Sequence, residues 1–236
     1  MRRHTYLIGA LLGVIGGLTL SSVAFSDPIG QTLQTTFSPK KQGGKTFGGV
    51  SMHLQHRLMY DSFAASHGPR QIAYTLPKDL KFVPGNVPVC QLSQIEHKLD
   101  SEARAACPHS IIGQGLLETD GGSLKSTFTF FRGDPAANQD LIGHLVVERN
   151  LLVLDLVGEI SGRTLTWVNL PNTPGTVVTT IDVTFNKRKT GTSTFFLMAR
   201  CGKKRRWSMT ETSTFYSGES LSALSTQTCK QKRAKH

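Results

Sequence analysis

LPKDLKFVPGNVPVCQLSQIEHKLDSEARAACPHSIIGQG, residues 76–115, is the stretch around which the fold is organised. It holds two of the four cysteines and four of the ten prolines of the chain. Within residues 92–106 apolar side chains recur every three or four positions, which is the spacing of one helical face. Cys90 and Cys107 flank this segment and Pro108 stops it, so we expect a short helix whose ends a disulfide joins.

Downstream of this stretch the chain has the pattern of strands separated by turns. Gly, Asn and Pro punctuate short runs that are rich in β-branched residues, and residues 50–58 upstream alternate in the same way. The sequence therefore predicts an all-β protein, either an antiparallel β-sandwich or an open β-barrel, with one short disulfide-closed helical insertion. The strands expected after the insertion are 111–118, 126–132, 141–149, 151–160, 164–168, 176–185, 193–199 and 207–215.

The N-terminus has the three parts of a secretory signal. Arg2 and Arg3 precede an apolar run at 6–20, and small residues follow up to Ser26. The run is shorter than the roughly 20 apolar residues that span a bilayer. We expect cleavage after Ser26 or Ala24, which predicts a secreted or loosely envelope-associated protein with no transmembrane anchor after processing. The remaining chain divides into one β-rich domain, 27–229, and a basic C-terminal tail, 230–236.

The four cysteines all lie in the part of the chain that would be exported. An even number of cysteines outside the cytoplasm favours two disulfides, for which three connectivities are possible. We predict Cys90–Cys107 and Cys201–Cys229, because each pair closes a local loop. Zinc is the alternative, but there is no CxxC pair and the spacings of 17 and 28 do not fit a zinc ribbon. We expect no metal and no cofactor.

The net charge of +11 falls to +9 when the two arginines of the signal are removed. A basic exported protein attracts anionic cell-wall or extracellular polymers, although the charge can equally serve solubility alone. Two basic runs are expected in turns at the ends of strands and are our candidate polyanion-binding residues: Lys187, Arg188, Lys189, Lys203, Lys204, Arg205 and Arg206.

No catalytic motif is assembled in the sequence. There is no GxSxG nucleophile elbow and no phosphate-binding loop. Asp155 and Glu159 faintly resemble the carboxylate pair of sandwich glycoside hydrolases, but an extended strand separates them by about 13 Å. His53 and His56 lie on opposite faces of a strand, so we interpret them as surface residues. We expect no catalytic residues and no enzymatic activity.

Several short motifs combine into a recognisable pattern. They are LPKDLKF at 76–82, VPVC at 87–90, Cys107-Pro108, IGQG at 112–115, and the late Cys201, Trp207 and Cys229. The pattern resembles an uncharacterised family of exported, four-cysteine, β-rich proteins of actinobacteria and related high-GC Gram-positive bacteria, with the signature LPKG-L-F, P-x-C, C-P and V-G-x-G. Asp79 replaces the usual glycine. The resemblance implies a secreted, disulfide-bonded β-rich domain and supplies no activity, ligand or catalytic residue.

Three functions are compatible with these features. The first is a non-catalytic, envelope-associated binding or structural module that contacts anionic polymer through its basic loops. The second is a carrier of lipid or another hydrophobic ligand with an apolar cavity, since residues 151–157 and 128–131 supply apolar strand surface. The third is a sandwich-fold hydrolase. The oligomeric state is not determined by the sequence.

Overall fold

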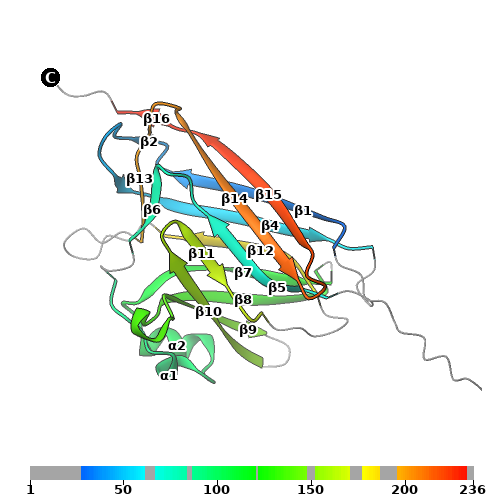
Figure 1. Ribbon diagram of the computed structural model, residues 1–236. Helices are drawn as coiled ribbons and strands as arrows, with labels where there is room; N and C mark the ends of the chain where they lie inside the picture. Colours follow the sequence, from blue (N-terminus) through cyan, green and yellow to red (C-terminus); the bar gives the residue numbers. More distant parts are fainter. Residues whose placement is uncertain are drawn as a thin grey trace, which may run out of the picture.

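The computed structural model describes residues 28–61, 67–83, 87–120, 122–147, 152–170, 177–186 and 196–232. Eleven antiparallel strands form one large sheet in the order β1-β4-β12-β7-β8-β9-β10-β11-β5-β14-β15, and two small sheets stand at one end of it (Figure 1). The expected all-β fold with a helical insertion is confirmed. The elements are β1 (Gly30–Ser38), β2 (Lys41–Gln42), β3 (Gly48–Gly49), β4 (Ser51–Met59), β5 (Pro69–Thr75), β6 (Leu80–Phe82), α1 (Leu92–Ile95), α2 (Asp100–Ala106), β7 (Ile111–Thr119), β8 (Leu124–Arg132), the 3-10 turn η2 (Pro135–Ala137), β9 (Leu141–Val147), β10 (Leu152–Ser161), β11 (Thr164–Trp167), β12 (Val178–Phe185), β13 (Leu197–Ala199), β14 (Arg206–Phe215), β15 (Ser220–Thr228) and β16 (Lys230–Gln231).

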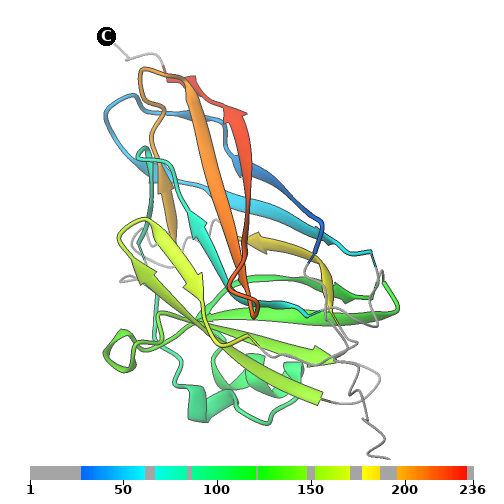
Figure 2. The same ribbon diagram turned by 45° about the vertical axis from the view of Figure 1, so that its right-hand side comes forward.

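The large sheet curves until its two edge strands, β1 and β15, lie side by side (Figures 1 and 2). Side chains of β15 bond to the backbone of β1 where a strand ladder would otherwise run. The Ser225 hydroxyl accepts a hydrogen bond from Thr35 N at 2.9 Å. The Gln227 amide accepts from Phe37 N at 2.6 Å and donates to Phe37 O at 3.0 Å. These bonds satisfy backbone groups that an open edge would expose, so the sheet is a nearly closed barrel.

Alternation along the strands decides which side chains point into the barrel. In β4 the even-numbered residues, Met52 to Leu58, are buried and the odd-numbered residues are more exposed. Trp207, at the start of β14, is fully buried. Its ring meets Phe37 edge to face at 5.6 Å, and its indole N–H donates to Arg200 O at 2.8 Å.

One end of the barrel is covered by the two small sheets. β13 pairs with β3 and β6, and β16 pairs in parallel with β2. The disulfide Cys201–Cys229 joins the segment after β13 to the end of β15. Both predicted disulfides, this one and Cys90–Cys107, are confirmed. Two disulfides are compatible with an oxidising, extracytoplasmic compartment.

The helical insertion lies outside the barrel, against β8 and β9 (Figure 1). Ile95 and Ala103 pack there with Phe131 and Ile142 around the first disulfide. The sequence predicted one helix over 92–106, whereas the structure divides the segment into α1 and α2. His97 has a φ of +63° between them, a left-handed conformation that ends a helix.

Most predicted strands are found close to their expected bounds, but β15 was not predicted. None of the described helices is long and apolar enough to cross a membrane. The signal segment and the first basic run, Lys187 to Lys189, lie outside the described residues. So do parts of four expected strands, namely 148–149, 151, 176 and 193–195.

Candidate functional site

The barrel encloses an apolar cavity of about 300 Å³. Side chains of β4, β5 and β7 to β12 line it, and most of them are aliphatic or aromatic. Among the described residues that line the cavity none is charged, and three carry a hydroxyl group: Thr119, Ser126 and Tyr74. The residue types match the mostly apolar lining of small-molecule pockets, and the volume lies at the lower end of their range of about 300–1,000 Å³.

Inward-facing glycines make the space for the largest rings. Gly143 on β9 and Gly158 on β10 both lie against the indole of Trp167. A Cβ atom added at Gly158 would stand 3.0 Å from that ring, which is tighter than nine in ten real Cβ contacts. Gly115 on β7 gives room in the same way to Val183 on β12. Small and large residues therefore alternate across neighbouring strands inside the barrel, as in other small barrels.

Aromatic rings close the cavity toward the end that carries the small sheets. Phe130 contacts Trp167 and Phe185, with ring centroids 5.8 Å and 5.0 Å away. The ring of Phe196 contacts the rings of Phe185 and Phe82, with centroid distances of 5.6 Å and 5.5 Å. The floor of the cavity is therefore a packed row of rings.

The cavity reaches the surface at the opposite end of the strands. Residues at the ends of four strands line it there: Thr119 of β7, Leu124 of β8, Val147 of β9 and Leu152 of β10. Leu152 is 48% exposed, although it also lines the cavity. We call this end the mouth. An exposed leucine continuous with a buried apolar surface gives a hydrophobic ligand a path inward.

A buried polar pair stands behind one wall of the cavity. His56 of β4 and Glu211 of β14 are both fully buried, and His56 Nδ1 is in direct contact with Glu211 Oε1. Tyr74 and Ile72, which line the cavity, are the cross-strand neighbours of Glu211 and Ser213. Within the described part of the chain, His56 Nε2, Glu211 Oε2 and Ser213 Oγ have no hydrogen-bond partner.

Burial governs the protonation of this region. Removal from water lowers the pKa of His56 to about 3, so its imidazole is neutral at neutral pH. Burial likewise raises the pKa of the Tyr74 hydroxyl far above its usual range. The prediction that His56 is a surface residue is wrong: β4 faces the barrel interior at this position. His53 is on the outer face, half exposed, and contacts Asp182 at 2.7 Å.

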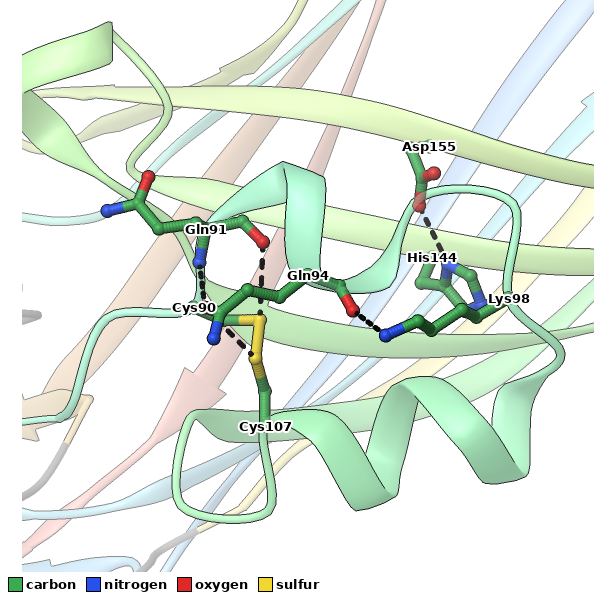
Figure 3. The surroundings of a disulfide bond; sticks show 7 residues. All are labelled: Cys90, Gln91, Gln94, Lys98, Cys107, His144 and Asp155. Carbon is green, nitrogen blue, oxygen red and sulfur yellow. Dashed lines mark hydrogen bonds and ion pairs between the residues drawn. A yellow bond between two sulfur atoms is a disulfide. The ribbon is translucent and has the colours of Figure 1, made fainter.

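A second buried histidine lies on the outside of the barrel, beneath the helical insertion (Figure 3). His144 Nδ1 is 2.7 Å from Asp155 Oδ1, and the two residues are cross-strand neighbours on β9 and β10. Thr129 donates to Asp100 Oδ1 at 2.5 Å close by, which ties α2 to β8. Asp155, considered above as half of a carboxylate pair, thus holds a histidine under the helices, and Glu159 is exposed further along β10.

The described basic run, Lys203 to Arg206, is exposed: Lys203 to Arg205 lie in the turn between β13 and β14, and Arg206 begins β14. It lies at the end of the barrel away from the mouth, and the fold brings other lysines to it. Lys230 N bonds Lys40 O at 2.9 Å, and Cys229 N bonds Arg205 O at 2.9 Å. We call this surface the basic end and define it as the described residues of 38–50, 76–83, 196–206 and 228–232. They hold twelve lysines and arginines and a single acid, Asp79.

A surface hollow of about 390 Å³ lies within the basic end. Lys78, Arg200, Lys203 and Lys204 line it. Asp79, which also lines it, is ion-paired with Arg200 at 2.8 Å. The hollow therefore keeps an excess of positive charge. Sequence proximity could not predict the contribution of Lys78 or Arg200, because β6 and β13 meet only in the folded chain.

The described residues contain no group of three or more His, Cys, Asp or Glu side chains arranged to hold a metal ion. Comparison with protein-family models gives no match, and a search of curated proteins finds no significant relative. The cavity and the basic end are therefore the two features from which a function is argued.

Proposed function

We propose that the protein is a non-catalytic carrier that holds a small hydrophobic ligand inside its barrel. The observation that supports this proposal is the uncharged cavity of about 300 Å³ with an exposed leucine at its mouth. The sequence left this function second to polymer binding, because apolar strands explain a packed core equally well. A packed core contains few voids larger than a water molecule, and this interior contains a much larger one.

The energetics of an empty cavity favour a ligand. Unfilled apolar volume costs about 24 cal/mol per Å³ in a protein core, so 300 Å³ corresponds to an upper value of roughly 7 kcal/mol. Water cannot offset this cost well, because a water molecule needs two to four polar partners and the lining offers few. A hydrophobic molecule of matching size regains the lost contacts without needing such partners.

The test is native mass spectrometry of the protein purified without detergent, together with solvent extraction and identification of the extract. We expect a bound mass that disappears on denaturation. Binding to an emptied sample should then be followed by the fluorescence of Trp167, which lines the cavity, with n-octane and 1-octanol as probes. The Trp167→Phe variant is the control that should lose the response. A protein that carries no ligand and binds neither probe would refute the carrier function.

The second candidate function, binding of anionic polymer, is favoured by the basic end. Twelve basic residues with one acid on a single surface create the positive field that draws a cell-wall or extracellular polyanion. This surface and the mouth are at opposite ends of the strands, so both functions are geometrically compatible. Membership of the exported four-cysteine family, suggested by the sequence pattern, is likewise part of our proposal.

Retention on an anionic polymer column tests this second candidate. K203Q/K204Q should elute at clearly lower salt than the wild type, since exposed charges act through a screened field. R57Q/R70Q removes the same charge from exposed positions outside the basic end and is the matched control. Equal elution of the two double variants would show that the basic end has no special role.

A further inference from the structure

Resting on the proposed carrier function, we propose that the ligand is an uncharged amphiphile with one hydroxyl or carbonyl oxygen, which hydrogen-bonds to Thr119 at the mouth. Its hydrocarbon part would extend from there to the aromatic floor at Phe130, Trp167 and Phe185.

Thr119 is the polar group that the cavity leaves unsatisfied. It is 8% exposed and lines the cavity, and its Oγ1 is buried with no hydrogen-bond partner in the described part of the chain. Its backbone oxygen is already occupied, because it accepts from Gly122 N at 2.8 Å and from Ser123 N at 3.1 Å. The side-chain hydroxyl is therefore the group of Thr119 whose hydrogen-bonding capacity is left unused. A buried hydroxyl without a partner is unfavourable, and a ligand oxygen would remove that cost.

The charges around Thr119 disfavour an anionic head group. Thr119 stands between Glu118 and Asp120 in the chain. The Glu118 carboxylate forms an ion pair with Lys125 at 3.0 Å, so the positive charge of Lys125 is already engaged. Asp120 accepts a hydrogen bond from Val177 N at 2.8 Å and keeps its carboxylate near the mouth. A fatty-acid carboxylate placed at Thr119 would meet this charge with no free cation among the described cavity-lining residues.

The rest of the lining specifies a hydrocarbon tail. Beyond Thr119 the cavity is walled mainly by aliphatic side chains, and it ends on the rings of Phe130, Trp167 and Phe185. Ser126 and Tyr74 are the other described lining residues that carry a hydroxyl. A second polar group deep in the ligand would find few partners there, and losing its water without a partner is unfavourable. One polar oxygen at the mouth and an apolar body inside therefore fit the distribution of polar atoms in the wall.

The test compares four probes with one eight-carbon chain: n-octane, 1-octanol, octanoate and octylamine. Binding to the full chain is measured by titration calorimetry and by Trp167 fluorescence. We expect 1-octanol to bind more tightly than octanoate or octylamine. Tighter binding of either charged probe than of 1-octanol would overturn the assignment of an uncharged head group.

Variants of Thr119 test the hydrogen bond itself. T119V keeps the shape of the side chain and removes the hydroxyl, and T119S keeps the hydroxyl. T119V should weaken 1-octanol binding about fivefold, the size of one net hydrogen bond, and leave n-octane unchanged. T119S should bind 1-octanol nearly as the wild type does. For each probe the dissociation constants of the variant and the wild type are compared as a ratio, which cancels the probe's own affinity for water.

The outcomes separate this inference from the proposed function. If T119V binds both n-octane and 1-octanol as the wild type does, the carrier function stands and the role of Thr119 is refuted. If the wild type binds none of the four probes, the carrier function is refuted, and this inference with it.

Discussion

Filling the cavity with a larger side chain should separate ligand binding from folding. Leu145 is suited to this because it is 5% exposed, lines the cavity, and lies between Phe128 and Leu154, which also line it. Leu145→Trp adds roughly 60 Å³ of side chain, about a fifth of the cavity of about 300 Å³. Strand neighbours surround the position on both sides, so the added ring can enter only the cavity.

The size of the effect follows from the displaced ligand volume. Roughly 60 Å³ corresponds to about two methylene groups of ligand, each worth about 0.8 kcal/mol, so affinity for 1-octanol should fall on the order of 15-fold. The folded state gains about 1.4 kcal/mol from the filled volume at about 24 cal/mol per Å³, and strain in the new rotamer offsets part of this. We therefore expect the free energy of unfolding to change by about 1 kcal/mol or less.

Titration calorimetry with 1-octanol and urea unfolding of the ligand-free protein measure the two quantities. Leu224→Trp makes the same substitution on β15, where Leu224 is 65% exposed, and should change neither. If Leu145→Trp is as stable as the wild type and binds 1-octanol equally well, the cavity is not the ligand site. A loss of several kcal/mol in stability would instead show that the cavity volume cannot accept the ring.

Three further predictions concern stability. Gly115→Ala should lower the free energy of unfolding in urea by about 1–3 kcal/mol, because its Cβ would overlap the backbone oxygen of Asp182 and the side chain of Val183. Gly68→Ala is the control and should leave it unchanged, because no atom lies near its Cβ. Because burial lowers the pKa of His56 to about 3, the unfolded chain binds this proton below pH 6.5 and the folded chain does not. The free energy of unfolding should therefore fall as pH drops from 6.5 toward 3, by up to about 1.4 kcal/mol per pH unit. An H56L/E211L double variant whose stability depends on pH with the same slope would contradict this. Cys90→Ser/Cys107→Ser, which opens a 17-residue loop, should lower stability by about 3 kcal/mol yet leave 1-octanol affinity unchanged, since the insertion lies outside the barrel; weaker binding in calorimetry would refute that separation.

The sequence missed β15 for a physical reason. Its residues, SLSALSTQT, are mostly small and polar, and its buried positions include Ser225 and Gln227. A strand is recognised from sequence by apolar residues on its inner face, and this strand instead uses that face to hydrogen-bond β1. The same strand decides between a sandwich and a barrel, so the sequence left both architectures open.

The candidate site was predicted unevenly. Lys203 to Arg206 were expected in a turn; Lys203 to Arg205 are found in one and Arg206 begins β14, while their neighbours Lys40 and Lys230 come from distant segments. His56 carries no local signal that distinguishes it from His53, because the difference depends on which face of β4 turns inward and on Glu211, 155 residues away. In the sequence, Thr119 likewise has no feature that distinguishes it from any other residue before a turn.

Local rules determined most of the strands, the helical insertion and both disulfides, because alternation, turn residues and short loop closure act over neighbouring positions. The cavity, its mouth, the buried His56–Glu211 pair and the basic end were decided only by the tertiary structure. Each depends on how strands far apart in the chain curve around one interior. A pattern of apolar residues specifies that an inner face exists, but whether the side chains on that face fill the space between them depends on the closed shape of the barrel.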